Sequence, residues 1–415
     1  MLDAVPVLDK DLPLYGVSAG LEAVEKLRKL AEPLADARIL HINSTAVGGG
    51  VAEHLATHVP LLRSAGIDAH WHIIHGSPEF FSATKQMHNS LQGMEVVVTP
   101  EMQRLCLDEL RDNARRIEGP WDIVVVHDPQ PAALLSLLAD EARQPGARWV
   151  WRCHIDLATP QPETVAFLLP FVERYDATIW TMEAFVPDWP NLDGIEVFTP
   201  TIDPLVPKNL DVEQQFSAAL CRRYGVDTTR PILCQVSRFD PWKDPVGVIE
   251  AYRMVRREVP EAQLVLVGSM ASDDPEAAHY WELTRQAAAA DPDIHLLPGV
   301  PDLAINAFQS MAEVVIQKSL REGFGLTVSE ALWKRTPVIG GRVGGITVQI
   351  EDGVCGHLVD SIEACAAQAT ALLREPDLAR TMGEQGRRRV RERFLSTREM
   401  GDYLQLFNRL LGTTS

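Results

Sequence analysis

The sequence predicts an α/β protein made of two doubly wound halves, each a mostly parallel sheet with helices on both faces. Three observations support this prediction. The chain has 415 residues, which exceeds the size at which a single hydrophobic core usually stops growing. Strand-like apolar runs alternate with amphipathic helical stretches, as in repeated βαβ units. A proline-rich break divides this pattern near its middle.

The first half contains five strand-like runs separated by helical segments. The stretches 51–64 and 131–143 carry apolar residues at helical spacing. Because a strand, a helix and a parallel strand connect in a right-handed way, these segments predict a parallel sheet covered on both faces. The expected strands are 38–42, 69–74, 123–127, 149–154 and 177–181.

The break between the halves spans 198–207, where three prolines interrupt the alternation. We therefore expect an N-terminal domain at 1–203 and a C-terminal domain at 204–390. The remaining residues, 391–415, are expected to form a C-terminal helix that packs back on one of the domains, with the N-terminal domain as the first candidate.

The second half repeats the alternation of strands and helices. Doubly wound sheets bind ligands beyond the carboxyl ends of their strands, so a ligand shared by two such domains is expected in the cleft between them. The expected strands are 232–237, 263–268, 294–297, 314–317 and 337–340, and the expected helices are 246–258, 275–290, 304–311 and 327–333.

Composition limits the classes of function. The formal net charge of -18 argues against a general nucleic-acid binder, which needs a basic face. The 46% of hydrophobic residues are typical of a soluble protein, and no apolar run is long enough to span a bilayer. The six cysteines show no CxxC pair and no zinc-ligand spacing, and the N-terminus lacks a signal sequence. We expect a cytoplasmic protein with free thiols, no metal, and neither a nucleic-acid nor a membrane partner.

The most informative motif is a pair of glutamates, Glu322 and Glu330, on either side of a Gly-Phe-Gly turn. Glu322 follows an expected strand, and Gly323 and Gly325 let the backbone approach a ligand closely. The helix expected from Thr327 presents free backbone amides at this turn. The arrangement suits a phosphorylated or hydroxyl-rich ligand.

Two further segments place a strand end before a helix. The triple glycine at 48–50 lacks the GxGxxG dinucleotide fingerprint. It either brings amides to a phosphate or to sugar hydroxyls, or it is a tight turn without a ligand. Arg238 and Lys243 are two cations five residues apart beside a helix start. They either clamp a diphosphate or belong to an ordinary surface loop.

Polar side chains also end two strands of the first half. His127 and Asp128 follow a buried apolar strand. A lone histidine there is commonly a satisfied core residue, but the adjacent aspartate favours a site group. Arg152, His154 and Asp156 end the next strand in the same way, although the arginine and the aspartate can also simply pair.

A polar stripe with helical spacing follows Glu79. It faces either an acceptor molecule or solvent. The stripe consists of Thr84, Lys85, His88 and Asn89. The segment 291–293 superficially matches a metal-binding DxD pattern, but it precedes a strand as a common turn does, and we expect no metal.

Together these motifs resemble the retaining, nucleotide-sugar-dependent glycosyltransferases of family 4. The likeness covers nearly the whole chain and rests on the order and spacing of the paired glutamates, the two cations and the glycine loop. It implies the GT-B fold, in which two Rossmann-like doubly wound domains face each other across a cleft. It also implies that Arg238 and Lys243 hold the donor diphosphate, while Glu330 holds the ribose.

The resemblance implies a role for each matching residue. Catalytic roles fall to His127, Asp128, Glu322, Arg238 and Lys243. Donor contacts fall to Gly48, Gly49, Gly50, Arg238, Lys243, Gly323, Phe324, Gly325, Leu326, Thr327 and Glu330. No cofactor is required, and the co-substrate is a nucleotide-diphosphate glucose whose base, in ADP-, UDP- or GDP-glucose, the sequence leaves open.

A narrower likeness concerns His-Ile-Asn-Ser-Thr at 41–45, the glycine loop, Glu79 and the polar stripe. These segments are similar to trehalose glycosyltransferring synthases, which join nucleotide-activated glucose to free glucose. This likeness implies acceptor contacts by Asn43, Glu79, Thr84, Lys85, His88, Asn89, Arg152, His154 and Asp156.

Other functions stay open at this stage. They are a sucrose- or glycogen-type transferase with another acceptor, a sugar-phosphate phosphorylase, and a non-catalytic sugar-nucleotide-binding protein. Retention follows either from front-face attack or from a covalent intermediate, and the lack of an obvious nucleophile pair favours the former. The oligomeric state is also open, with a homodimer as the working expectation.

Overall fold

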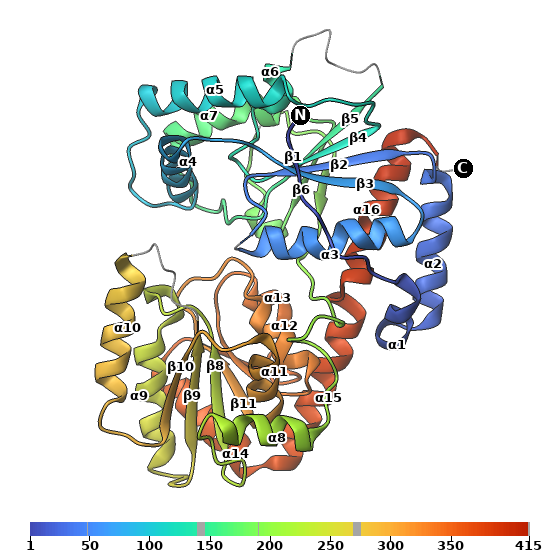
Figure 1. Ribbon diagram of the computed structural model, residues 1–415. Helices are drawn as coiled ribbons and strands as arrows, with labels where there is room; N and C mark the ends of the chain where they lie inside the picture. The colour runs from blue at the N-terminus through green and yellow to red at the C-terminus, as the bar shows by residue number, and fades with distance from the viewer. Residues whose placement is uncertain (48, 139–145, 190, 269–274, 414–415) are drawn as a thin grey trace. The chain divides into compact units, whose positions relative to one another are not determined.

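A computed structural model of the chain (Figure 1) describes residues 1–47, 49–138, 146–189, 191–268 and 275–413. The chain forms two compact units. Unit 1 comprises Met1–Pro200 together with Ser396–Ser415, and unit 2 comprises Thr201–Leu395. The division lies after Pro200, close to the expected boundary after residue 203, and the C-terminal segment belongs to unit 1.

Unit 1 contains a seven-stranded sheet with the strand order β1-β3-β2-β4-β5-β6-β7. All neighbouring pairs are parallel except β1 with β3, which are antiparallel. The strands are β1 (Asp3–Ala4), β2 (Arg38–Asn43), β3 (Asp68–Ile73), β4 (Ile123–His127), β5 (Arg148–Arg152), β6 (Ala177–Trp180) and β7 (Ile195–Val197).

Helices cover both faces of this sheet (Figure 1). One hydrophobic core joins β2, β4, β5 and β6 to the helices α4 to α7. The helices are α1 (Gly16–Ala19), α2 (Leu21–Ala31), α3 (Gly50–Ser64), α4 (Pro78–Leu91), α5 (Pro100–Ala114), α6 (Leu134–Leu137), α7 (Pro162–Val172) and α16 (Ser396–Leu411), and the 3-10 turns are η1 (Leu12–Tyr15), η2 (Glu32–Leu34) and η4 (Glu183–Phe185).

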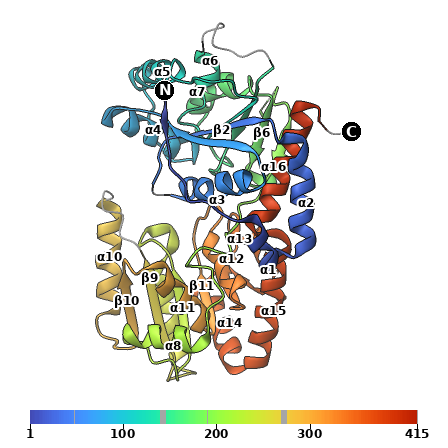
Figure 2. The ribbon, with the colours of Figure 1, turned by 45° about the vertical axis from the view of Figure 1, so that its right-hand side comes forward.

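The C-terminal helix α16 lies beside α2, as Figures 1 and 2 both show. It buries Tyr403 and Phe407 completely, and the Asn408 side chain donates a hydrogen bond of 2.8 Å to the carbonyl of Leu30. The last helix therefore completes the layer that α2 and α3 form on one side of the sheet.

Unit 2 contains a six-stranded, fully parallel sheet with the order β10-β9-β8-β11-β12-β13. The strands are β8 (Ile232–Val236), β9 (Gln263–Gly268), β10 (Ile294–Pro298), β11 (Val314–Gln317), β12 (Val338–Gly341) and β13 (Gly356–Val359). The central strands β8, β9, β11 and β12 are buried and mostly apolar, as expected of a parallel sheet covered on both faces.

The core of unit 2 packs α9 and α14 against one face of this sheet, while α8 and α11 pack together and α11 contacts β8. The helices are α8 (Gln214–Arg223), α9 (Pro245–Arg256), α10 (Pro275–Ala288), α11 (Asp302–Met311), α12 (Leu326–Trp333), α13 (Ile346–Gln349), α14 (Ile362–Arg374) and α15 (Pro376–Arg393), and the 3-10 turn is η5 (Pro241–Lys243).

The predicted α/β class with two doubly wound parallel sheets is confirmed. One expected helix differs: of 131–143 only Leu134–Leu137 is helical among the described residues, and 139–145 lie outside them. The strand expected at 149–154 ends at Arg152, which places His154 in the loop that follows.

The helix starts carry local signals that explain their positions. Ser77 and Thr99 cap α4 and α5, since their hydroxyls accept hydrogen bonds from the third amide of each helix. A proline follows each cap, at the first helical position, where its missing N–H costs nothing. The polar stripe of the sequence therefore lies on a well-defined helix, α4.

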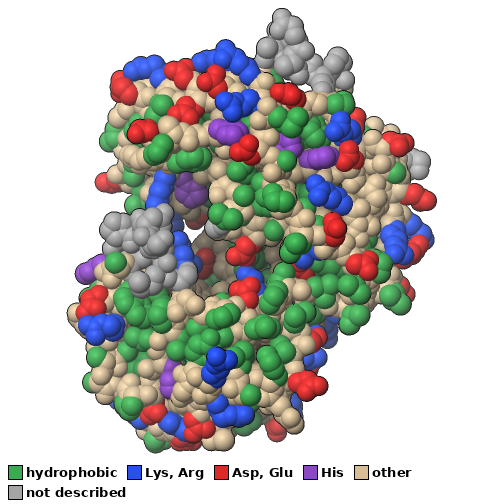
Figure 3. All heavy atoms as spheres, in the orientation of Figure 1, with side chains coloured by type: hydrophobic (Ala, Val, Ile, Leu, Met, Phe, Trp, Pro, Cys, Tyr) green, Lys and Arg blue, Asp and Glu red, His purple; other side chains and the backbone are tan. Residues whose placement is uncertain are grey.

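On the face seen in Figure 3, basic and acidic side chains are interspersed. Within the part of the chain that the structure describes, no helix is long and apolar enough to cross a membrane. The six cysteines are all buried and free.

Candidate active site

In both units, several polar residues of the sequence motifs follow the strands between which the order of connections reverses. In unit 1 the chain runs from β2 outward to β3 and returns to β4 on the other side of β2. In unit 2 it runs from β8 through β9 and β10 and returns to β11 beside β8. Loops diverge at such a switch point, and doubly wound folds bind ligands in the crevice between them.

The two predicted donor cations follow β8. The Arg238 side chain is 62% exposed, and its guanidinium lies 3.2 Å from the carboxylate of Asp240. Lys243 ends the short turn η5, and its ammonium forms an ion pair with Glu322. One cation is thus open to solvent, and the other is paired with the first glutamate of the motif.

Glu322 is 9% exposed, and its carboxylate accepts hydrogen bonds from three side chains. Ser319 donates at 3.2 Å and Gln317 at 3.5 Å, and the third donor is Lys243. A carboxylate held in this way keeps one orientation, in which it can accept hydrogen bonds from sugar hydroxyls.

The Gly-Phe-Gly turn after Glu322 rests on a second loop. An ideal Cβ on Gly344 would lie 1.7 Å from the Glu322 carbonyl oxygen, so only glycine fits there. From the same side, the Gln349 side chain donates a hydrogen bond of 2.6 Å to the Phe324 carbonyl. The loop and short helix that follow β12 therefore support the turn.

The turn leads directly into the start of α12. Gly325 has a left-handed backbone with φ of 79° and precedes the helix without a side-chain cap. Gly323 has open space where a side chain would lie, and Leu326 and Thr327 at the helix start are half-buried. Uncapped amides at a helix start attract anions.

Glu330, the second glutamate, is buried and lies 3.0 Å from the ammonium of Lys208. Lys334 donates to the Glu330 carbonyl at 3.0 Å and to Asn209 at 3.1 Å. Burial lowers the pKa of Lys334 to about 7. Lys208 and Asn209 come from the segment that follows the domain boundary, and the sequence motifs did not include them.

In unit 1 three histidines form a hydrogen-bonded chain at the ends of β2, β4 and β5. His41 Nδ1 lies 3.0 Å from His127 Nε2, and His127 Nδ1 lies 2.9 Å from His154 Nε2. His41 and His127 are fully buried, whereas His154 is half-buried. Both ring nitrogens of His127 are occupied within the protein, so His154 is the member of the chain that can reach a ligand.

These histidines are neutral at physiological pH. Burial lowers the pKa of His41 to about 3 and holds the pKa values of His127 and His154 well below the ordinary value. A neutral imidazole both donates and accepts a hydrogen bond. Each ring can therefore donate one hydrogen bond to the next ring and accept one from the previous ring, so that all the hydrogen bonds of the chain run in the same direction.

Asp128 has a left-handed backbone with φ of 67°, which is unusual for a residue with a side chain. Its carboxylate accepts a hydrogen bond of 3.0 Å from the backbone amide of His154. Burial raises the pKa of Asp128 to about 6. The strained backbone and the hydrogen bond join the end of β4 to the loop after β5.

A second layer of polar groups lies behind the histidine chain. His54 and Arg152 both approach the carboxylate of Glu399 on α16, at 3.5 and 3.6 Å. The rings of His58 and Tyr403 have centroids 4.3 Å apart. Glu399, His54 and His58 were not among the predicted site residues, because no motif joins α3 to the distant α16.

Two predicted acceptor residues are committed to the protein interior. Arg152 is fully buried, and its guanidinium donates to the carbonyls of Trp180 and Phe198. Asn43 is buried, accepts a hydrogen bond from Trp71 and donates to the Thr45 carbonyl. These contacts favour structural roles in place of the acceptor contacts that their positions at strand ends suggested.

The polar stripe on α4 is only partly accessible. Thr84 is buried, and its hydroxyl donates to the Phe81 carbonyl, so it faces the core. Lys85 is exposed, and His88 and Asn89 are half-buried. Burial lowers the pKa of His88. Three members of the stripe can therefore meet a ligand.

The remaining predicted residues lie in loops and at helix starts. Glu79 is exposed in the first turn of α4, and half-buried Asp156 accepts a hydrogen bond from the Ala158 amide. Gly49 precedes α3 with φ of 94° and no side-chain cap, and Gly50 begins the helix. Gly48 lies outside the described residues. No His, Cys, Asp or Glu group suited to a metal ion occurs within the described ranges.

Solved structures share this architecture. The sucrose-phosphate synthase of Thermosynechococcus elongatus matches with a TM-score of 0.72 and 18% identity, over 91% of this chain and 100% of that chain. Anabaena HepE in complex with UDP and glucose matches with a TM-score of 0.66 and 16% identity, over 90% and 100%. Two largely parallel sheets with polar groups at their switch points thus define the GT-B fold.

Sequence comparison narrows this class. A family model described as "Trehalose synthase, N-terminal domain" matches residues 41–187, and one described as "Glycosyl transferases group 1" matches residues 219–389. The chain is 48% identical to the trehalose synthase of Rubrobacter xylanophilus over 99% of this chain and 100% of that protein. It is 45% identical to that of Thermococcus litoralis over 96% and 97%. The chain belongs to the trehalose synthase family of glycosyltransferases.

A more distant relative is the trehalose phosphorylase of Grifola frondosa, which is 29% identical over 92% of this chain and 58% of that protein. The family recognised from the sequence motifs is thereby confirmed, and the protein is an enzyme of the glycosyltransferase class.

Proposed function

We propose that the protein transfers glucose from a nucleotide-diphosphate glucose to free glucose, with retention of configuration, to form trehalose and a nucleoside diphosphate. The observation that carries this proposal is the set of donor groups at the switch point of unit 2. Lys243, Glu322 and the uncapped start of α12 lie at the two loops where a doubly wound domain binds a nucleotide.

The donor site supports the departure of a diphosphate. Arg238 and Lys243 supply positive charge, and the first amides of α12 supply further hydrogen-bond donors. Binding of the donor exchanges the Lys243–Glu322 ion pair for a Lys243–phosphate pair. Glu322 is then free to accept hydrogen bonds from the transferred sugar, and Glu330 is assigned to the ribose hydroxyls.

The acceptor is assigned to unit 1. His154, Lys85, His88 and Asn89 offer accessible polar groups at the ends of the strands and on α4. In the step proposed here, the acceptor hydroxyl attacks the anomeric carbon as its bond to the phosphate oxygen breaks, and the hydroxyl proton passes to the leaving phosphate. His127 and Asp128 act on this step by orienting His154.

A second candidate function is the phosphorolysis of trehalose, because the chain is 29% identical to a trehalose phosphorylase over 92% of its length. In that reaction inorganic phosphate takes the place of the nucleotide diphosphate at the same cations. Transfer to an acceptor other than glucose, and binding of a sugar nucleotide without catalysis, are the remaining alternatives.

Product analysis tests these functions directly. The enzyme is incubated with glucose and with ADP-, UDP- or GDP-glucose in turn, and a second set contains trehalose with either a nucleoside diphosphate or phosphate. We expect a non-reducing disaccharide in the first set and nucleotide-glucose in the second. Glucose 1-phosphate formed only with phosphate would establish the phosphorylase instead, and transfer only to another acceptor would reject the trehalose assignment.

The Lys243→Ala variant serves as the control for these assays. Loss of the ammonium should lower turnover by about 10- to 1,000-fold, because the charge on the leaving diphosphate is no longer stabilised. Chelation of divalent metals should leave the rate unchanged, since the proposed mechanism needs no metal or other cofactor. Unchanged turnover in both Lys243→Ala and Arg238→Ala would contradict the donor assignment.

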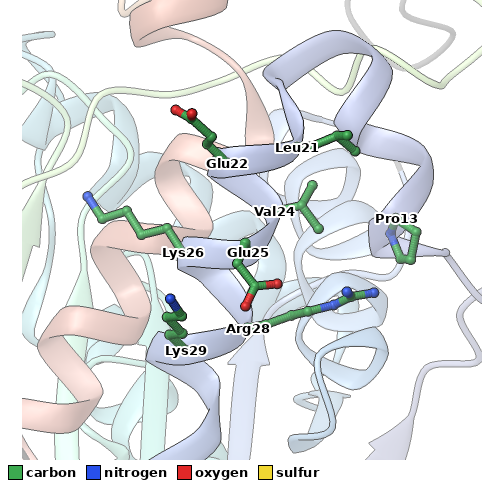
Figure 4. A pocket seen from close by; sticks show the side chains of 8 residues that line it. All are labelled: Pro13, Leu21, Glu22, Val24, Glu25, Lys26, Arg28 and Lys29. Carbon is green, nitrogen blue, oxygen red and sulfur yellow. The ribbon is translucent and has the colours of Figure 1, made fainter.

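We further propose that the enzyme works in the cytoplasm as a homodimer. Six buried, free thiols fit a reducing compartment. In the N-terminal region, Leu8, Val17 and Leu21 are 88%, 86% and 77% exposed, and such apolar groups commonly mark an interface. Beside them, charged side chains of both signs on α2 line a groove (Figure 4), which suits a contact between two copies.

A further inference from the structure

Two lysine–carboxylate ion pairs connect the same two loops of unit 2. The first loop follows β8 and the second follows β11. Lys243 pairs with Glu322, and Lys318 pairs with Asp244. Between the two pairs, the Leu320 amide donates a hydrogen bond of 2.7 Å to the Trp242 carbonyl. The loops are therefore joined at three successive points, and one of them is the pair of Lys318 with Asp244.

The backbone of Lys243 is held on both sides. Its amide donates to the Asp240 carboxylate at 3.1 Å, and its carbonyl accepts from the Gln235 side chain at 2.7 Å. The next residue, Asp244, has φ of 48° and ψ of 52°. This left-handed conformation is disfavoured for a residue with a side chain, so other contacts must hold Asp244 in place.

Two contacts hold the Asp244 carboxylate. One oxygen accepts from the Gly247 amide at 3.1 Å and caps α9, and the other accepts from the Lys318 ammonium. The side chains of Lys318 and Asp244 are 7% and 19% exposed. A Cβ on Gly247 would lie 2.2 Å from the carboxylate, so the cap fits closely against the helix.

Loss of the Lys318 charge would leave the Asp244 carboxylate largely buried and unpaired, which strongly disfavours its present position. The Asp244 side chain would then turn toward solvent, and its left-handed backbone conformation would no longer be stabilised. Because Lys243 directly precedes Asp244, its side chain would point in a different direction. Lys318 itself follows β11 directly and is committed to Asp244.

We infer that Lys318 is a positioning residue, which aims Lys243 at the donor diphosphate through its ion pair with Asp244. The inference rests on the proposed function in one respect, namely that Lys243 binds the diphosphate. During the reaction Lys243 exchanges its carboxylate partner for a phosphate. The Lys318–Asp244 ion pair remains formed and maintains the conformation of the loop after β8.

The first test compares Lys318→Met, which keeps the length of the side chain without its charge, with the wild-type enzyme. We expect the KM for the nucleotide-glucose to rise and kcat to fall, with a combined loss of about 10- to 100-fold in kcat/KM. The KM for glucose should stay unchanged, and Lys318→Arg should recover part of the loss.

A matched control separates positioning from stability. Arg230→Met breaks a partly buried ion pair with Asp293, 2.7 Å long, beside the opposite end of β8. This variant should lower the melting temperature but leave both KM values and kcat as in the wild type. If Lys318→Met also changes only the melting temperature, the role of Lys318 is structural and the inference is wrong.

A double-mutant cycle identifies the residue through which Lys318 acts. In a Lys243→Ala background, the further change Lys318→Met should alter kcat/KM by less than about twofold, because the group that it positions is already absent. A loss that persists in full in this background would show that Lys318 meets the donor by itself, and it would overturn the inference.

A binding experiment keeps the test independent of turnover. Inorganic pyrophosphate is titrated while the intrinsic tryptophan fluorescence is recorded, to which Trp242, 46% exposed on the same loop, contributes. The wild type and Arg230→Met should bind equally, and Lys318→Met should bind about 10-fold or more weakly. Equal affinity in all three proteins, or no binding by the wild type, would refute the inference. If the wild type shows this dependence on Lys318 but transfers no glucose, the proposed function fails while the role of Lys318 stands.

Asp244→Asn provides a second variant if Lys318→Met does not give a folded protein by circular dichroism. The asparagine keeps an oxygen that can cap α9 but removes the ion pair. It should weaken pyrophosphate binding to the same extent as Lys318→Met. Wild-type affinity in a folded Asp244→Asn variant would contradict the inference.

Discussion

Asp128 has both an unusual backbone conformation and a raised pKa. Its φ of 67° places it in the left-handed region, and burial raises the pKa of its carboxyl to about 6. The carboxylate receives the His154 amide at 3.0 Å. The charge on Asp128 is therefore present at neutral pH and disappears within the mildly acidic range.

We predict that kcat/KM falls as the pH decreases through about 6, because protonated Asp128 holds the His154 loop less firmly. The Asp128→Asn variant should lose this step in a pH profile of initial rates. Since the pKa in the folded state exceeds the ordinary aspartate value of 3.8, this group makes stability decrease as the pH rises from about 4 to about 6. A wild-type pH profile in the variant would contradict the prediction.

Single residues also show how far the sequence could locate the site. Its motifs included Arg238, Lys243 and Glu322, which the fold brings to one switch point, because each follows a buried strand. Lys318 carried a similar signal, because it is a charged residue directly after β11. It was not among the predicted site residues, since the motif was defined by the two glutamates nearby. Lys208 had no such signal, since only the tertiary fold brings it to Glu330.

At the scale of elements, the turn after β11 depends on the loop that follows β12. Gly344 has φ of 45°, and a Cβ there would meet the Glu322 carbonyl at 1.7 Å. The two loops can approach each other this closely because Gly344 and its neighbour Gly345 carry no side chain. The position of Glu322 is thus determined partly by Gly344, which lies 22 residues further along the chain.

We predict that Gly344→Ala displaces the turn and lowers kcat/KM for the donor by about 10-fold or more. Gly353→Ala is the matched control, because Gly353 also has a positive φ, of 77°, but open space around its Cβ. The control should lose about 1 kcal/mol of stability from backbone strain alone and keep its kinetics. Steady-state rates and thermal unfolding of both variants provide the measurements, and equal donor kinetics in both would refute the role given to Gly344.

The helices and strands were predictable where the spacing of apolar residues was regular. Buried strands such as β4 and β8 match the apolar runs closely, since a parallel sheet needs continuous apolar segments. The stretch 51–64 was likewise predictable as a helix and forms most of α3, although its buried His58 counts as polar in any pattern. The roles of His54 and Glu399 emerge only when α3 packs beside α16.

For the molecule as a whole, the buried histidines make stability depend on pH. Burial lowers the pKa values of His41, His54, His58, His127 and His154. Below pH 6.5 the unfolded chain binds protons at these sites while the folded protein does not. Each histidine therefore removes up to about 1.4 kcal/mol of stability per pH unit as the pH falls below 6.5, until its folded-state pKa is reached.

We predict that the free energy of unfolding falls steeply between pH 6.5 and pH 5, and that His58→Phe makes this decline shallower. Exposed His279 offers the control His279→Phe, which should keep the slope of the wild type. Chemical denaturation at several pH values measures the three slopes. Identical slopes in all three proteins would show that the histidine cluster does not govern acid stability.

Association is the second property at this scale. If the exposed N-terminal residues form the dimer contact, the double variant Val17→Ser with Leu21→Ser should sediment as a monomer while the wild type sediments as a dimer. Ile195→Ser changes an apolar side chain of edge strand β7 that is 47% exposed and should remain dimeric. Sedimentation velocity distinguishes these outcomes, and a monomeric wild type would exclude the dimer.

The C-terminal helix has a consequence for the covalent plan of the chain. Because α16 belongs to unit 1, unit 2 is a guest inserted into a host, and its two ends meet where the Ile202 amide donates a hydrogen bond of 2.8 Å to the Phe394 carbonyl. A guest with adjoining ends can be excised, or opened elsewhere and rejoined. Residues 201–395 are therefore a natural unit for separate expression, and one proteolytic cut at either junction leaves host and guest covalently joined.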